Sequence, residues 1–187
     1  LHVRETLTPR LVQELLQGQI DSAIVALPVS EPAFTETPLF SESFVLVRPA
    51  KDAASPVPDA DALRRMRLLL LEEGHCFRDQ VLEACPNLQP SVENKAGRVH
   101  TAAEGSSLET MRHMVASGLG ITILPQSAAA TGHYSPNQLT TRPFTEPGPR
   151  RTVALAWRAS FPRHKAIDAL RESIHQCHPG ELDSHND

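Results

Sequence analysis

Cysteine is scarce in this chain, which contains only three in 187 residues. Small secreted domains that depend on disulfides carry a much denser and even-numbered set of cysteines. The odd, low number therefore argues against a secreted disulfide scaffold. It indicates a reducing compartment, and we expect a cytoplasmic protein.

Long apolar runs and basic runs are also absent from the sequence. A membrane-spanning helix needs about 20 consecutive apolar residues, and no stretch approaches that length, so we expect no membrane partner. Lys and Arg together number 18 against 22 Asp and Glu, for a net charge of −4. Without a basic run, we expect this segment to bind nucleic acid poorly by itself.

No secretory signal is visible at the start of the sequence. The chain instead opens with a pattern that is already strand-like, Leu1-His2-Val3. We therefore expect the N-terminus to be truncated, so that a preceding segment could carry targeting information or another domain.

Strand-like and helix-like patterns alternate along the chain, which predicts an α/β fold. The first three are a strand at 1–5, a helix capped by Thr8 with Pro9 behind it, and a buried strand at 20–27. This order predicts a βαβ unit with parallel strands. Further strands are expected at 44–47, 67–71, 98–103, 119–125, 139–144 and 152–157. Further helices are expected at 59–65, 75–85, 106–118, 126–131 and 162–176.

About eight strands fit two small sheets better than one large sheet. The chain could cross from one sheet to the other near 44–48 and return near 151–157. Such an arrangement would leave a cleft between two lobes, a common place for a ligand. The polar stretch at 86–97 reads as a mobile connection, and the polar end of the chain, 177–187, as a disordered tail.

Two cysteines flank one short predicted helix. Four leucines read as a buried strand, Gly74 breaks it, a helix starts near His75 or Cys76, and Pro86 prevents its continuation. Cys76 therefore lies where free backbone N–H groups and the positive end of the helix dipole favour an anion. His75 and Arg78 could add positive charge, and all of these influences favour a thiolate.

The spacing of Cys76 and Cys85 does not allow a disulfide while the helix exists. Nine residues of α-helix span about 13–14 Å and place the two side chains on roughly opposite faces. A disulfide needs Cα atoms within about 7 Å, so oxidation would have to unwind the segment. This would be a redox switch. Two unrelated buried thiols are the simpler interpretation, and sequence physics leaves both open.

Nine histidines raise the question of a metal site. A candidate metal site could be assembled from the two cysteines with His75, His100 and His113. No CxxC or HxxxH spacing supports such a site, so we predict neither a metal nor a cofactor.

The helix with the two cysteines resembles a known family. Its motif runs Glu73-Gly74-His75-Cys76-Phe77-Arg78-Asp79-Gln80, with Cys85 nine residues after Cys76. Matching stretches continue at 107–118, 121–125 and 149–152. On these motifs the chain resembles the peroxide-sensing OxyR-type regulators, which are LysR-type transcription factors. The resemblance covers essentially residues 1–176.

The resemblance implies a role for several residues. Cys76 matches the cysteine that hydrogen peroxide oxidises to a sulfenic acid, and Cys85 matches the resolving thiol that forms a reversible disulfide with it. His75 matches a histidine beside the reactive thiol, Thr8 a pocket threonine, and Arg151 an arginine that stabilises the thiolate. With Arg78, these three are the predicted ligand-binding residues.

The resemblance also implies an architecture. It is a two-lobed, periplasmic-binding-protein-like α/β fold with two small mixed sheets. Residues 1–43 and 152–176 would form regulatory lobe I, and residues 44–151 lobe II with the redox helix. The family's N-terminal winged helix-turn-helix, which binds DNA, is absent from this sequence.

The partners implied by the resemblance are hydrogen peroxide, a second copy of the chain in a homodimer or homotetramer, and DNA through the absent domain. Oxidation would rearrange the dimer and so regulate antioxidant genes. Glu109 matches an acidic residue in the first turn of the predicted helix at 106–118. A contact with RNA polymerase is one interpretation of this residue, and its interaction with the helix dipole is an adequate alternative. The chain would then be a regulator and not an enzyme.

Two other functions are consistent with the same residues. A LysR-type or solute-binding module could sense a small metabolite in the cleft between the lobes, with inert thiols. A thiol peroxidase would use the same cysteines but would turn over rapidly with a reductant, whereas a sensor reacts stoichiometrically.

Overall fold

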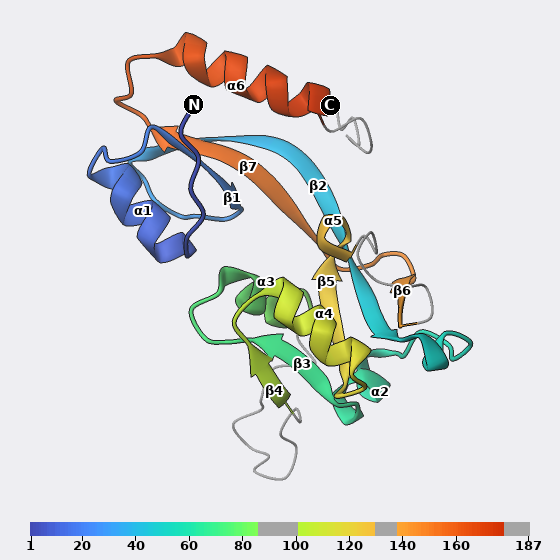
Figure 1. Ribbon diagram of the computed structural model, residues 1–187. Coiled ribbons are helices and arrows are strands. Elements are labelled where there is room, and N and C mark those ends of the chain that lie inside the picture. The colour runs from blue at the N-terminus through green and yellow to red at the C-terminus, as the bar shows by residue number, and fades with distance from the viewer. Residues whose placement is uncertain (86–100, 130–137, 178–187) are drawn as a thin grey trace. The chain divides into compact units, whose positions relative to one another are not determined.

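The computed structural model describes residues 1–85, 101–129 and 138–177 (Figure 1). The predicted mobile connection at 86–97 and nearly all of the predicted tail at 177–187 lie outside these residues. The chain forms two compact units, Leu1–Glu42 with Arg151–Asp187, and Ser43–Arg150. Each unit is described by itself below.

The first unit is built around strand β7. Strand β1 pairs with it in antiparallel register, with Ile24 opposite Leu155, and strand β2 is its other neighbour. Two helices complete the unit. The elements are α1 (Thr8–Leu16), β1 (Ser22–Ala26), β2 (Phe34–Pro49), β7 (Arg150–Arg158) and α6 (His164–Cys177).

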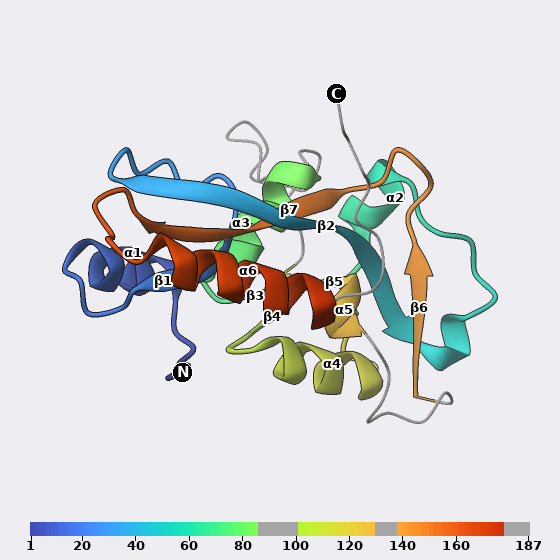
Figure 2. The same cartoon turned by 90° about the horizontal axis from the view of Figure 1, so that it is seen from above.

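Two small cores cover the two faces of the β7 sheet. Leu155 and Trp157 pack with Ile167 of α6, whereas Ala156 packs with Leu15 of α1. Successive side chains of a strand point to opposite faces, which explains how one strand serves both cores. Figures 1 and 2 accordingly show α6 along one face of β7 and α1 near the other.

The predicted strand at 1–5 is wrong, and so is the parallel βαβ unit built on it. Residues 1–7 form no regular element, and Leu1 and Val3 are exposed. A strand persists only where its backbone N–H and C=O groups pair with another strand. No strand of the described chain pairs with this segment, because β1 forms its ladder with β7 instead.

The predicted cap of the first helix is also wrong. Leu7 is the N-cap of α1 and its side chain forms no capping hydrogen bond, while Thr8 is already the first helical residue. Pro9 then occupies an early position where its missing N–H costs nothing, as predicted from its fixed backbone angle. The helix ends at Leu16 with Gln17 as its C-cap, and Gly18 then turns the chain with a positive φ of 74°.

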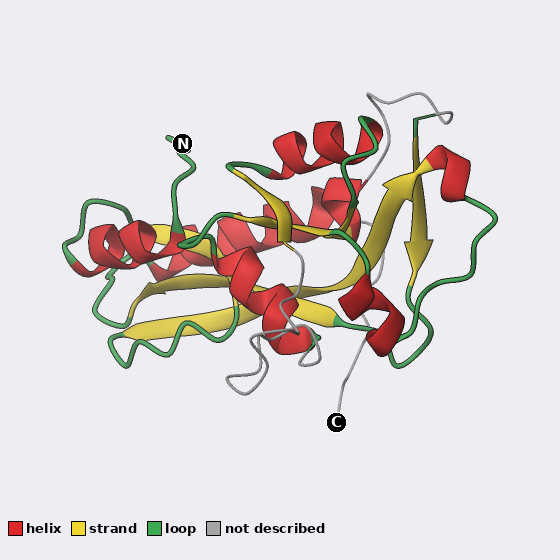
Figure 3. Ribbon diagram, turned by 90° about the horizontal axis from the view of Figure 1, so that it is seen from below, coloured by secondary structure: helices red, strands yellow, loops and turns green. Residues whose placement is uncertain are grey.

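The second unit holds a mixed sheet, and the predicted α/β fold is confirmed. The second half of β2 pairs antiparallel with β5 and β6, while β3 runs parallel to β4 and β5. Figure 3 distinguishes the helices and strands of the chain by colour. Its strands are β3 (Leu68–Leu71), β4 (Thr101–Gly105), β5 (Ile121–Pro125) and β6 (Leu139–Pro143). Its helices are the short η1 (Ala50–Asp52), α2 (Ala60–Arg65), α3 (Cys76–Ala84), α4 (Leu108–Ala116) and α5 (Gln126–Ala129).

The core of the second unit is centred on β3. All four of its leucines are buried, as expected for a strand covered on both faces. Helix α3 contributes Phe77 and Val81, and the ring of Phe77 meets that of Phe44 edge to face at 5.2 Å. Gly120 is required beside β3, since a Cβ there would lie 2.3 Å from the carbonyl oxygen of Arg67.

The longest described helix is α6, with 14 residues. None of the helices in the described ranges combines the length and the apolar character needed to cross a bilayer.

Candidate functional site

Helix α3 begins at Cys76, as the sequence predicts. Gly74 turns the chain out of β3 with a φ of 93°, and His75 then serves as the N-cap in an extended conformation. The carbonyl of His75 accepts from the N–H of Arg78 at 2.9 Å and closes the first turn. The half-buried Cys76 side chain therefore starts from the helix position at which backbone N–H groups favour an anion.

Cys85 lies at the other end of α3, as its C-cap. Its N–H donates to the carbonyl of Val81 at 3.0 Å, and its side chain is half-buried. Burial raises the pKa of the Cys85 thiol, because the thiolate loses solvation there. All three cysteines belong to the described residues, and none is in a disulfide.

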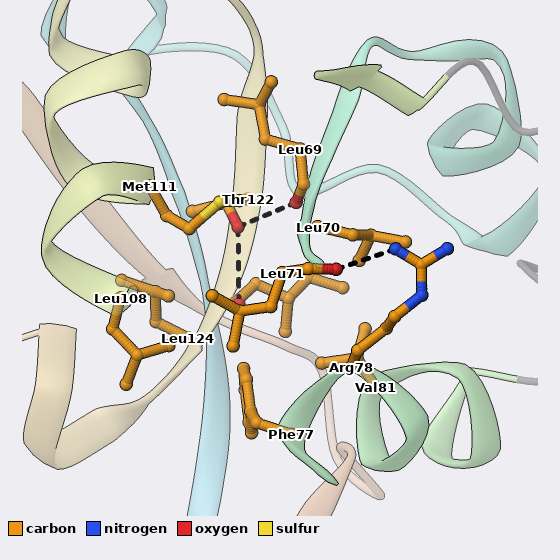
Figure 4. Close-up of a pocket in the computed structure, with 11 residues that line it drawn as sticks. Leu69, Leu70, Leu71, Phe77, Arg78, Val81, Leu108, Met111, Thr122 and Leu124 are labelled. Atoms are coloured by element: carbon orange, nitrogen blue, oxygen red, sulfur yellow. Dashed lines mark hydrogen bonds between the residues drawn. The ribbon is translucent and has the colours of Figure 1, made fainter. Parts of the chain in front are cut away.

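Arg78 extends from the first turn of α3 back toward the end of β3. Its Nη1 donates to the carbonyl oxygen of Leu71 at 2.7 Å and to Oε1 of Glu104 at 2.8 Å. Figure 4 shows the bond to Leu71. The guanidinium thus fastens α3 to the ends of β3 and β4.

The remaining two predicted residues belong to the first unit. Thr8 is the first residue of α1, and Arg151 follows the start of β7. Arg151 donates through Nε and Nη2 to the same oxygen of Glu42, at 2.9 and 2.8 Å. The structure therefore groups His75, Cys76, Arg78 and Cys85 on one element, and the participation of Thr8 and Arg151 stays a prediction.

Glu104 and Glu42 are the acidic residues that the sequence analysis missed. Glu104 lies 26 positions from Arg78, and Glu42 lies 109 positions from Arg151. No local motif marks either of them, because each meets its arginine only in the folded structure. Glu104 of β4 meets Arg78 of helix α3, and Glu42 of β2 meets Arg151 of β7. Glu109 in contrast bonds to Arg112 within its own helix, at 3.1 Å.

A small cavity lies where α3 and α4 meet β3 and β5 (Figure 4). Phe77, Arg78 and Val81 line it from α3, and Met111 lines it from α4. Its volume is about 10 Å³, which is room for about one water molecule. This cavity is therefore too small for a metabolite.

No group of three or more His, Cys, Asp or Glu side chains in the described part of the chain is arranged to hold a metal ion.

Comparison with known proteins identifies one family that matches nearly the whole chain. The family model described as "LysR substrate binding domain" matches residues 1–177. A probable hydrogen peroxide-inducible genes activator of Streptomyces viridosporus is 36% identical over 182 residues, covering 95% of this chain and 55% of that protein. The chain thus spans about half the length of the curated relatives it matches.

Solved structures agree with these relatives. The reduced form of the OxyR regulatory domain of Pseudomonas aeruginosa is 48% identical with a TM-score of 0.79, covering 94% of this chain and 82% of that one. A cysteine-to-serine variant of Corynebacterium glutamicum OxyR with hydrogen peroxide bound is 29% identical with a TM-score of 0.80. That match covers 95% of this chain and 55% of the other.

Proposed function

Because the chain belongs to the LysR substrate-binding domain family and to its OxyR-type regulatory domains, we propose that it senses hydrogen peroxide for a DNA-binding transcription activator. The observation that carries this proposal is the placement of two thiols at opposite ends of α3. Relatives named for hydrogen peroxide support the identity of the oxidant.

The first step takes place at Cys76. Its thiolate attacks one oxygen of hydrogen peroxide, the O–O bond breaks, and hydroxide leaves to be protonated to water. The cysteine becomes a sulfenic acid. We assign His75, Thr8, Arg78 and Arg151 to binding the peroxide and stabilising the charge on the leaving oxygen, as hydrogen-bond donors or nearby positive charges.

Cys85 acts second. Its raised pKa and its burial keep it a neutral thiol while α3 is folded, so it does not compete with Cys76 for peroxide. When the helix opens, the sulfur of Cys85 attacks the sulfenic sulfur, the S–O bond breaks, and water leaves. The product is a Cys76–Cys85 disulfide, which a dithiol can reduce again.

The output of the switch belongs to the whole protein. We propose that the refolded segment changes contacts in a homodimer or homotetramer, and so the spacing of DNA-binding heads that lie outside this chain. The two regulatory lobes would be residues 1–43 with 152–176, and residues 44–151. The protein would act in the cytoplasm as a regulator and not as an enzyme, with RNA polymerase as a further partner through Glu109.

Brief treatment with one equivalent of hydrogen peroxide tests the proposal. Peptide mapping by mass spectrometry should find the Cys76–Cys85 disulfide in the wild-type chain and in a Cys177→Ser control. In Cys85→Ser, Cys76 should instead be trapped as a sulfenic acid by a dimedone probe, and Cys76→Ser should show neither product.

Two outcomes would contradict the proposal. Unmodified thiols at stoichiometric peroxide would favour a metabolite-binding module of the same family, with inert cysteines. Rapid consumption of many equivalents of peroxide in the presence of a dithiol would indicate a thiol peroxidase.

A further inference from the structure

The guanidinium of Arg78 is held by two acceptors from two different strands. The carbonyl oxygen of Leu71 ends β3, and the carboxylate of Glu104 comes from β4. Glu104 stands beside Leu70 in the parallel register of these strands. The Arg78 side chain is only 16% exposed, whereas that of Glu104 is 43% exposed. We refer to Arg78, Glu104 and the Leu71 carbonyl as the α3 clasp.

The α3 clasp fastens the segment that the proposed disulfide must rearrange. Arg78 lies between Cys76 and Cys85 in the sequence, in the first turn of the helix. The nine-residue helix has about two and a half turns, and the disulfide requires its two ends within about 7 Å. When the last turn opens, the turn that remains is too short to persist alone in water. Arg78 is therefore among the residues that move.

We infer that Glu104 is a positioning residue of the redox switch, which holds Arg78 and with it α3 in the helical, reduced arrangement. This inference rests on the proposed function. A contact that exists only in the reduced fold stabilises that fold alone, so it shifts the equilibrium away from the disulfide. Glu104 touches neither cysteine in this role, and its effect reaches them through Arg78.

Loss of the contact between Arg78 and Glu104 should shift the dithiol–disulfide equilibrium toward the disulfide. Weakening the α3 clasp destabilises the dithiol form and leaves the disulfide form unchanged. The disulfide should then form more readily, and its reduction potential should become more negative. Because Glu104 is partly exposed and water screens its charge, we expect a shift of three- to tenfold in the equilibrium constant. A tenfold shift corresponds to about 30 mV for this two-electron couple.

The test is a redox titration of Glu104→Gln in mixtures of reduced and oxidised dithiothreitol. In each exchange the dithiol reduces the protein disulfide to two thiols and becomes the cyclic disulfide, so the equilibrium constant follows from the two ratios. Glu104→Gln should favour the protein disulfide at low salt. The difference from wild type should shrink as salt is raised, because the lost contact is an ion pair.

Two further variants separate the α3 clasp from a simple change of charge. Glu73→Gln removes the same charge from the turn before α3, where Glu73 is exposed and forms no ion pair within the described part of the chain, and it should match the wild type. In an Arg78→Met background, Glu104→Gln should have no additional effect. An unchanged far-ultraviolet circular dichroism spectrum and a cooperative melting transition of reduced Glu104→Gln would confirm that this variant is folded.

The inference is overturned if Glu104→Gln titrates within twofold of wild type at low salt. It is also overturned if the shift persists undiminished in the Arg78→Met background, since Glu104 would then act on the thiols directly. Failure of the proposed function looks different, because the wild-type chain itself would form no Cys76–Cys85 disulfide.

Discussion

Cys76 and Cys85 differ in their surroundings although one helix carries both. Both thiols are half-buried, but Cys76 is the first residue of α3, at the positive end of the helix dipole, whereas Cys85 caps its C-terminal end. The raised pKa of Cys85 has the sign expected when burial penalises a charged group. These surroundings are consistent with the proposed roles, in which Cys76 attacks the peroxide and Cys85 reacts second.

The pH dependence of alkylation should report this difference. A raised pKa means less thiolate at any given pH, so alkylation of Cys85 by iodoacetamide should rise at a higher pH than in the unfolded chain. In urea the same thiol should titrate near the ordinary value of about 8.5. Peptide-resolved mass spectrometry would measure both profiles. Coincident profiles for Cys85 in the folded and unfolded chain would contradict the predicted burial effect.

The raised pKa of the Cys85 thiol also makes a small, pH-dependent contribution to the free energy of unfolding. The folded form holds the Cys85 proton more tightly than the unfolded form. The stabilisation is therefore complete below the unfolded pKa and is lost as the pH rises through the folded pKa. Alkaline solution should loosen the reduced state around α3.

Several arginines of this chain bind backbone carbonyls. Arg48 is 2% exposed and donates to the carbonyl of Pro56 at 3.0 Å, and Arg158 donates to the carbonyl of Ile20 at 3.1 Å after the end of α1. Arg78 does the same at Leu71. The planar guanidinium with its five donors suits this task. In the sequence these residues look like ordinary surface charges, and only the fold shows otherwise.

At the scale of elements, helix α3 is the part of the chain that the proposed switch must unfold. Its amides 80–85 bond within the helix in the reduced form and should be protected from hydrogen exchange. After oxidation these amides should exchange at least tenfold faster, because a disulfide between the helix ends breaks those bonds. Helix α4, which Ser107 caps at its N-terminus, should keep its protection and serves as the internal control. Retained protection in α3 after complete oxidation would show that the disulfide forms without unwinding.

Local patterns predicted most elements, and the errors have a common cause. The buried strand Leu68–Leu71, the helix that starts at Cys76 and the helix capped by Ser107 all follow from short-range periodicity and capping. Strand β2 was expected only from Phe44, yet it begins at Phe34, in a polar stretch interrupted by Pro38. The neighbour of its first half is β7, more than 100 residues away, and no local signal shows that pairing.

The same limit applied to the candidate site. The two thiols and their spacing could be read from the sequence, and helical geometry then excluded a disulfide in the folded helix. The partners of Arg78 and Arg151 could not be predicted, because tertiary structure brings Glu104 and Glu42 to them from 26 and 109 positions away. Charge pairs set by tertiary structure leave no fixed spacing in a sequence.

At the scale of the whole molecule, β2 and β7 are the strands that pass from one unit into the other. On one side of the boundary the N–H of Phe44 donates to the carbonyl of Pro149 at 2.8 Å. On the other side Arg151 binds Glu42, and the hydroxyl of Ser41 donates to the Arg151 carbonyl at 3.4 Å. Both units thus depend on these two strands remaining together.

Replacement of Glu42 by Gln should therefore lower the stability of the first unit substantially. The Glu42 side chain is 6% exposed and that of Arg151 is 20% exposed, so the variant leaves an arginine charge in a largely buried place without its counter-charge. Breaking a buried ion pair from one side costs about 3 kcal/mol, which is about 6–12 °C in melting temperature for a chain of this size.

Trp157, the only tryptophan, lies in the core of this unit, so its fluorescence during unfolding measures the change. The exposed pair of Arg171 with Asp168 gives the matched control, since Asp168→Asn should cost well under about 1 kcal/mol. A Glu42→Gln shift no larger than that of Asp168→Asn would show that the Glu42–Arg151 pair does not hold β2 and β7 together.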